Sequence, residues 1–410
     1  MTMHRTWVGG LAVLAAAALS FSGCSTGGSE GSGSSTPPAS AASSAQASTS
    51  GASAPLWPEP GAGELPASAT KSMQAILDGW IESAGLNGVT AGVVTADGTW
   101  AGAAGEDGAG EELQPDSAMF MASMTKTFTA AEVMLLASRG LVDLDAPLTD
   151  YIEVPFDTQG ATVRQVLGMR SGFPDIPFEF TQDLIEADLD REWTVTEMLA
   201  EMPEDTTRMG TLGGPPRYNP LNYQLLSEVI AKITKQPVAQ AVRADLLDPA
   251  GLPRTWTQAG EAPTVPLSVG TDPPGTTLVA TGPYLPSRSM ASFWAGGASM
   301  AAEAADLARW GYLLYGGHVI DSALVAQMEA GAEADQMGVP YALGTQVLTN
   351  ASGATFVGHA GGGPDYPYTG NLSVWTADPQ VAVAVLTPQP ADFPTQIYDL
   401  VMQLHQAAAE

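Results

Sequence analysis

The sequence predicts an α+β fold, in which an antiparallel sheet is flanked by helices and interrupted by a helical insertion. Three observations indicate this. A hairpin pattern lies near the start of the globular part, segments with helical periodicity follow, and strand-like runs and a last helix close the chain. Strands at both ends of a chain with helices between them are typical of a sheet domain that carries an inserted helical part.

The N-terminus has the features of an export signal. Arg5 precedes the apolar run VGGLAVLAAAALSF, which is too short to span a bilayer as an ordinary helix. Cys24, the single cysteine of the chain, follows directly and resembles the lipidated cysteine of a bacterial lipobox, although Phe21 stands where that pattern prefers leucine. We therefore expect residues 1–24 to be a lipoprotein signal and the protein to be lipid-anchored on the extracellular face of the cell membrane. An ordinary cleavage site beside a free cysteine is the alternative.

Residues 25–65 are rich in Ser, Gly, Ala, Thr and Pro and contain almost no large apolar side chains. Such a segment cannot bury enough surface to offset the entropy of ordering it. We expect a disordered tether there and one globular domain over residues 66–410.

The formal net charge of the chain is −29, from 44 acidic against 15 basic residues. A surface of this sign repels nucleic-acid phosphates, so we exclude DNA and RNA as partners.

The elements follow from periodicity and turn signals. Met73, Ile76, Leu77 and Trp80 share one face of a predicted helix, and Asp97-Gly98 separates two short runs as a hairpin turn does. We expect the sheet part at about 66–150 and 290–410, and the helical part at about 151–289. Further helices are predicted at 123–139, 194–202, 221–235, 238–247, 303–315 and 394–408, and strands at 341–348, 354–358, 371–377 and 380–386.

Ser123 and Lys126 carry the most specific chemistry. Residues three apart at the start of a helix lie on one face, so the two side chains project together. A desolvated lysine near the positive helix terminus shares or loses its proton readily and can activate a serine. The same spacing recurs at Ser68 and Lys71, where we expect only an exposed first helical turn beside the tether.

Five segments, in order, resemble the serine β-lactamase and penicillin-binding protein family, in the branch of class C β-lactamases, DD-carboxypeptidases and related esterases. These segments are FMASMTKTFTAAEVMLLASRGLVDLDAPLTDYI, RQVLGMRSGFPD, RYNPLNYQLLSEVI, FWAGGASMAAEAADLARWGYLLYGG and VGHAGGGPDY. The resemblance implies that family's fold, with the active site in the cleft between its sheet part and its helical part.

The resemblance also implies a role for each matching residue. Ser123 is the acylated nucleophile, Lys126 its proton partner, and Tyr218 a second group in proton transfer; whether Lys126 or Tyr218 is the base stays open. His359 faces Tyr218 and the substrate as a hydrogen-bond donor. Gly361 allows close backbone approach, and the N–H groups of Gly362 and Ser123 form the oxyanion hole.

One position departs from the family pattern. The second motif ends in asparagine in the family and in Pro220 here, and proline has neither a polar side chain nor an N–H. Asn219 and Asn222 are adjacent but out of register. Anchoring of a substrate amide at this substrate-binding position is therefore in question.

The remaining candidates favour structural roles. Gly-x-Ser-x-Gly occurs as GCSTG and GGSEG, without the strand and helix that a nucleophile elbow needs. We expect His318 in an exposed loop and His405 on the surface of the last helix. Dispersed histidines and one cysteine predict no metal site and no cofactor.

We therefore expect an exported serine hydrolase that forms an acyl-enzyme, with D-alanyl peptides or related amides of the cell wall as substrates. A carboxylic esterase of the same fold is the first alternative. A non-catalytic binding module on that fold is the second, and Pro220 is the residue that favours it.

Overall fold

The computed structural model describes residues 55–410 except 204–205 and 259. Within these residues, an 8-stranded antiparallel sheet has the order β2-β1-β11-β10-β9-β8-β7-β6. Its strands are β1 (Gly88–Thr95), β2 (Thr99–Gly105), β6 (Glu333–Ala334), β7 (Pro340–Tyr341), β8 (Gln346–Thr349), β9 (Thr355–Gly362), β10 (Thr369–Trp375) and β11 (Val381–Thr387). A 3-stranded sheet joins β3 (Met119–Phe120), β5 (Met300–Ala302) and β4 (Thr255–Thr257), in that order.

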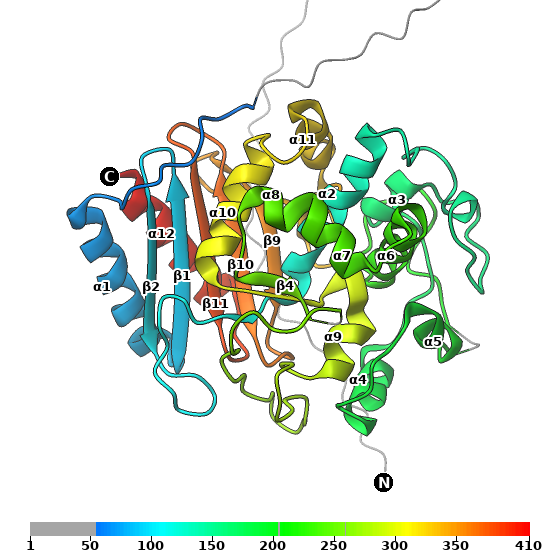
Figure 1. The fold of residues 1–410 in the computed structure, drawn as a ribbon, viewed down its shortest axis with the longest axis horizontal. Helices are drawn as coiled ribbons and strands as arrows, with labels where there is room; N and C mark the ends of the chain where they lie inside the picture. Colours follow the sequence, from blue (N-terminus) through cyan, green and yellow to red (C-terminus); the bar gives the residue numbers. More distant parts are fainter. Residues whose placement is uncertain (1–54, 204–205, 259) are drawn as a thin grey trace, which may run out of the picture. The chain divides into compact units, whose positions relative to one another are not determined.

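Helices cover both faces of the large sheet (Figure 1). Helices α1 (Ala67–Ala84) and α12 (Tyr398–Ala409) pack on one face, and α10 (Ala304–Tyr315) packs on the other. The sequence of β11 explains this arrangement, because Val381, Val383 and Val385 face α1 and α12 while Ala382 and Ala384 join the core on the α10 side. A strand buried on both faces is apolar throughout, as β11 is.

The helical part lies beyond β9 and is built around α2 (Thr125–Ser138) and α6 (Leu221–Thr234), which pack against each other. Two of its shorter helices begin with capping boxes, at Thr162 with Gln165 and at Thr194 with Glu197, which satisfy the first backbone N–H groups. The other helices are α3 (Val163–Leu167), α4 (Phe178–Ala187), α5 (Val195–Ala200), α7 (Val238–Val242), α8 (Asp248–Ala250), α9 (Arg288–Trp294) and α11 (Ser322–Glu329). Short 3-10 or π turns are η1 (Ala122–Met124), η2 (Leu148–Asp150), η3 (Arg243–Leu247), η4 (Ala295–Gly297) and η5 (Phe393–Ile397).

The predicted fold class is confirmed, and most predicted elements lie within a few residues of the observed ones. The run at 341–348, predicted as one strand, is instead the end of β7, a turn and the start of β8. The turn contains Gly344 at φ +74°, where an added Cβ would lie 2.3 Å from Cβ of Ala130 on α2. Close packing of this turn on α2 therefore interrupts the strand.

Residues 55–65 differ from the expected disordered tether. The N–H of Leu56 donates to the Gly316 carbonyl at 2.8 Å, and the Trp57 ring meets Tyr312 edge to face with centroids 5.3 Å apart. Leu65 is buried at 6 % exposure. A tryptophan and a leucine give this stretch enough apolar surface to pack on the domain. The export signal, Cys24 and the two Gly-x-Ser-x-Gly matches lie outside the described residues.

Both histidine expectations outside the motifs are corrected. The side chain of His318 keeps only 8 % exposure, because residues 58–59 cover it: Nδ1 lies 3.3 Å from Glu59 and Nε2 lies 3.2 Å from the Pro58 carbonyl. His405 is fully buried, with Nε2 3.1 Å from the Ser373 hydroxyl. Burial lowers the pKa of His405 to about 3, so this ring is neutral. One face of α12 packs against the sheet, which hides the histidine.

Glu132 is a buried acid on α2 with no exposure to solvent. Burial, and then the negative charge of nearby Asp245, raise its pKa to about 8, although Arg139 opposes the shift. The carboxyl is therefore protonated in the folded protein at neutral pH.

We predict that this carboxyl makes the protein less stable as pH rises. Between about pH 5 and the raised pKa of Glu132, the folded state holds a proton that the unfolded chain has lost, so the free energy of unfolding falls by up to about 1.4 kcal/mol per pH unit. Glu132→Gln should reduce this slope, because an amide is neutral at every pH, and urea unfolding across that pH range measures it. Glu82→Gln on the exposed side of α1 is the control. Equal slopes in wild type and Glu132→Gln would contradict the assignment.

Candidate active site

Ser123 lies where the chain turns from strand to helix. It belongs to η1, which follows β3 and leads directly into α2. Ala122, just before it, has φ 47°, in the left-handed region that a residue with a Cβ adopts only under constraint. This turn places the half-buried Ser123 side chain at the start of α2, where backbone N–H groups are free of helical partners.

Lys126 lies against Ser123, as the sequence predicts. Its Nζ is 2.9 Å from Ser123 Oγ and 2.8 Å from the carbonyl oxygen of Gly297. The side chain is 1 % exposed, and burial lowers its pKa to about 7. A neutral amine is thus available at ordinary pH to accept the serine proton.

The Gly297 carbonyl is a site group that the sequence reasoning missed. It follows Ala295, whose φ is 40°, and Gly296, whose own carbonyl accepts a 2.7 Å hydrogen bond from Thr129 of α2. A Cβ on Gly296 would lie 2.8 Å from both the Tyr223 carbonyl and the Ser227 Cβ of α6. The Gly-Gly pair therefore lets this turn fit between α2 and α6, and that pair was the available signal.

Tyr218 completes the contact around the nucleophile. Its ring centroid is 5.0 Å from Lys126 Nζ, and its hydroxyl is close enough to Ser123 for the two to interact. Burial raises the pKa of the Tyr218 hydroxyl well above its usual range, so the phenol keeps its proton. Its backbone is fixed by Gln336, whose amide accepts from the Tyr218 N–H at 2.7 Å and donates to the Tyr218 carbonyl at 2.9 Å.

His359 lies near Tyr218, with ring centroids 6.0 Å apart, but its hydrogen bonds differ from the expected role. Nδ1 is 2.5 Å from the Ala360 carbonyl, which can only accept, so Nδ1 carries the proton. Burial, and then the charge of Lys126, lower the pKa of His359 to about 3, which leaves Nε2 as an acceptor for the Tyr341 hydroxyl at 3.4 Å. The ring therefore donates to its own strand rather than to a substrate.

The two glycines of the third motif bring β9 against the nucleophile turn. A Cβ on Gly361 would lie 2.4 Å from the Met121 carbonyl, so only glycine permits this approach. The Ala360 N–H points to the edge of β9 that faces β8 and donates to the Gln346 side chain at 2.8 Å. Backbone N–H groups alternate along a strand, so the Gly362 N–H is directed to the same edge. The structure thus brings Gly362 and Ser123 to one place.

A cavity of about 430 Å³ opens over these groups. Ser123, Lys126, Tyr218, Pro220 and Gly362 all contribute to its lining. Most of the rest is apolar or aromatic, including Phe120, Trp294, Met337, Tyr366, Phe393 and Tyr398. Among the described lining residues, Lys126 is the one charged side chain.

Comparison with known proteins identifies the family. Residues 67–406 match the sequence family described as Beta-lactamase. The chain belongs to the beta-lactamase family. With the Ser123–Lys126 contact in place, this protein is a serine hydrolase, and the binding-module alternative is disfavoured.

Solved structures share this fold, and a curated relative shares part of the sequence. D-amino acid amidase from Ochrobactrum anthropi SV3, in complex with L-phenylalanine, superposes with a TM-score of 0.71 at 22% identity, over 83% of this chain and 98% of that one. D-stereospecific amidohydrolase from Streptomyces sp. gives 0.66 at 22% identity, over the same shares of the two chains. Penicillin-binding protein 4* of Bacillus subtilis is 26% identical over 143 residues, which are 35% of this chain and 31% of that protein. The matched part thus spans about a third of that relative's length.

The departure at Pro220 is not compensated by its neighbours. The Asn219 amide donates to the Pro174 carbonyl at 2.9 Å and accepts from the Leu221 N–H at 3.0 Å. The side-chain amide oxygen of Asn222 accepts from the Ser171 hydroxyl at 2.6 Å. Both asparagines are buried and used within the helical part, so neither replaces the family's motif asparagine.

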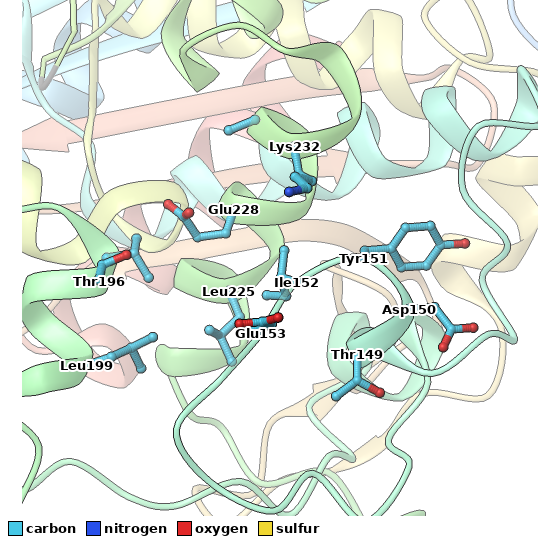
Figure 2. A pocket seen from close by; sticks show the side chains of 12 residues that line it. Thr149, Asp150, Tyr151, Ile152, Glu153, Thr196, Leu199, Leu225, Glu228 and Lys232 are labelled. Atoms are coloured by element: carbon cyan, nitrogen blue, oxygen red, sulfur yellow. The ribbon is translucent and has the colours of Figure 1, made fainter.

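The other candidates lie apart from this cavity. Ser68 and Lys71 are exposed on α1, as expected. A larger hollow of about 710 Å³ lies between residues 149–153, α5 and α6 (Figure 2). No serine, cysteine or histidine is among its described lining residues, so it lacks a nucleophile and base of this kind. None of the helices in the described part of the chain has the length and apolar character needed to cross a bilayer.

We predict that Ser123 acylation depends on the neutral form of Lys126. Because burial lowers the lysine pKa to about 7, the rate of labelling by a fluorophosphonate should rise as pH increases through that value and level off above it. Lys126→Arg should slow labelling by roughly 10²–10⁴, because a guanidinium keeps its proton. Lys71→Arg, at the same spacing from the exposed Ser68, is the matched control and should label at the wild-type rate. Wild-type labelling of Lys126→Arg would remove the lysine from the mechanism.

Proposed function

We propose that this protein hydrolyses amides of D-amino acids through an acyl-enzyme on Ser123. The proposed substrate class is D-alanyl peptides of the cell wall or related amides, and within that class the protein prefers amides without a free carboxylate beside the scissile bond. The observation that carries the proposal is the 2.9 Å contact between Ser123 Oγ and a desolvated Lys126 within an apolar cavity. The names of two similar structures, a D-amino acid amidase and a D-stereospecific amidohydrolase, support the amide class.

In the first half-reaction, Lys126 accepts the hydroxyl proton while Ser123 Oγ bonds to the substrate carbonyl carbon. The N–H groups of Ser123 and Gly362 stabilise the oxyanion, and one such donor is worth about 10²–10³ in turnover. The C–N bond then breaks, and the leaving amine receives the proton held by Lys126. In the second half-reaction, water attacks the acyl carbon, Lys126 accepts its proton, and Ser123 recovers a proton as the acid leaves.

Lys126 is the base in this proposal, and Tyr218 is a proton relay. Burial acts on the two groups in opposite senses, since it lowers the pKa of the lysine and raises the pKa of the phenol. At neutral pH, Lys126 therefore accepts protons while Tyr218 holds one. The phenol, which lines the cavity beside Ser123 and Lys126, can pass that proton on toward the leaving group.

The cavity disfavours a free carboxylate on the substrate. Lys126 is the one basic side chain among the described lining residues, its amine already contacts Ser123 and Gly297, and the proposed reaction needs it in the neutral form. A free carboxylate beside the scissile bond would lose its hydration without gaining a cationic partner, which is costly. Among D-alanyl compounds, the proposal therefore favours amides without that carboxylate over D-alanyl-D-alanine peptides.

Carboxylic esters are the second candidate, and Pro220 favours them. An ester has no amide N–H that needs an acceptor, and it carries a better leaving group. The non-polar Pro220 side of the cavity therefore suits an ester as well as a neutral amide.

The test compares three substrates with the protein from residue 55 onward. We predict that D-alanyl-D-alaninamide, which has the scissile bond of D-alanyl-D-alanine but no carboxylate, has a kcat/KM at least about tenfold above that of the dipeptide, a difference of about 1.4 kcal/mol, and that D-alanine p-nitrophenyl ester is also turned over. Ser123→Ala should remove all three activities. Preferential turnover of the dipeptide would overturn the proposed preference against a carboxylate, and turnover of the ester alone would favour the esterase.

We also propose that Cys24 carries a lipid and holds the enzyme at the outer face of the cell membrane. The single cysteine directly after the apolar run supports this. Cys24→Ala should move the protein from the membrane fraction to the soluble exported fraction. Unchanged fractionation and an unchanged N-terminal mass would contradict the lipoprotein assignment.

A further inference from the structure

Gln346 is a polar residue of the active cavity that belongs to none of the motifs. It is the first residue of β8, its exposure is 6 %, and it lines the same cavity as Ser123. It lies beside Ala360 of β9. Strand β9 pairs with β8 as far as Gly358 and then continues beyond the end of β8.

One hydrogen bond fixes the orientation of the Gln346 amide. The Ala360 N–H donates to Oε1 at 2.8 Å, and since only the oxygen of an amide accepts, Nε2 is directed elsewhere with two N–H donors. Within the described part of the chain, the contact with Ala360 is the one hydrogen bond seen for this side chain. The nitrogen is not among the fully enclosed polar atoms that lack a partner. Its donors are therefore accessible beside Ala360, which lines the cavity together with Gln346.

A donor pair held in a largely buried wall gains most from a ligand acceptor, because water reaches it poorly. Pro220 offers no donor to the cavity, and the neighbouring Asn219 and Asn222 bind within the helical part. The free edge of β9 runs from Gln346 toward the oxyanion position at Gly362, so an extended acyl chain can lie along it.

We propose that Gln346 Nε2 binds the carbonyl oxygen of an N-acyl group on the substrate and so takes the anchoring role that Pro220 cannot perform. The proposal rests on the hydrolase function above and narrows its substrate class to N-acylated D-amino acid derivatives. Simple alkanoyl compounds lack the second carbonyl and gain nothing from this donor.

Two substrates isolate the contact between Gln346 and the N-acyl group. They are the p-nitrophenyl esters of N-acetyl-D-alanine and of 2-methylpropanoic acid. The leaving group is the same in both, and a methyl group replaces the acetamido group in the second. The ratio of their kcat/KM values cancels effects on Ser123 and Lys126 that both substrates share. Gln346→Met removes the donors, and Gln346→Glu replaces them with oxygen while keeping an acceptor for the Ala360 N–H. Each variant should lower the ratio by about tenfold, the value of one good hydrogen bond.

Gln403→Met is the matched control, because Gln403 binds Asp399 on α12 and does not line the cavity; its ratio should equal that of wild type. A wild-type ratio in Gln346→Glu, with Ser123 still acylated, would overturn the anchoring role, even if Gln346→Met did not fold. Absence of turnover of both esters by the wild-type protein would instead overturn the hydrolase function on which the proposal rests.

Discussion

The active site depends on one buried lysine. Lys126 lies in a space that α2, the turn at Gly296 and Gly297, and Tyr218 enclose, and its amine contacts Ser123 Oγ and the Gly297 carbonyl. Two acceptors keep the amine in place, while loss of solvent lowers its pKa to about 7. Burial of an ammonium is normally costly, and here the same desolvation leaves the amine about half deprotonated near neutral pH, so that it can act as a base.

The surrounding backbone is shaped to keep that lysine enclosed. Ala122 and Ala295, on either side of the site, have φ values of 47° and 40°, which cost energy for residues with a Cβ. The first directs Ser123 into the cavity, and the second precedes the turn that brings the Gly297 carbonyl to Lys126. Gly361 lets β9 approach the same helix start. The strained residues and the close backbone approaches thus all lie around Ser123 and Lys126.

Local patterns in the sequence were sufficient to predict the parts of the site that lie close together in the chain. The i and i+3 spacing places Ser123 and Lys126 together, and the alternating runs predict the central strands. Only the resemblance to a family predicts roles in the site for Tyr218, His359, Gly361 and Gly362. Sequence patterns do not predict the features of the site that depend on tertiary packing. These are the contact of Lys126 with the Gly297 carbonyl, the contact of the Gln346 amide with Ala360, and the proton on His359 Nδ1. Residues 55–65 and His405 were misjudged for the same reason, since their burial depends on distant surfaces, Tyr312 for Trp57 and Ser373 for His405.

The central claim is that Lys126 is neutral in a large fraction of molecules near pH 7, and NMR tests it directly. The chain has four lysines, Lys71, Lys126, Lys232 and Lys235, so a protein labelled with isotopic lysine gives a simple titration of side-chain Cε and Nζ shifts. We predict that one lysine, absent from the spectrum of Lys126→Arg, titrates at about 7. Absence of any lysine signal that titrates near this value in the folded protein would contradict the account.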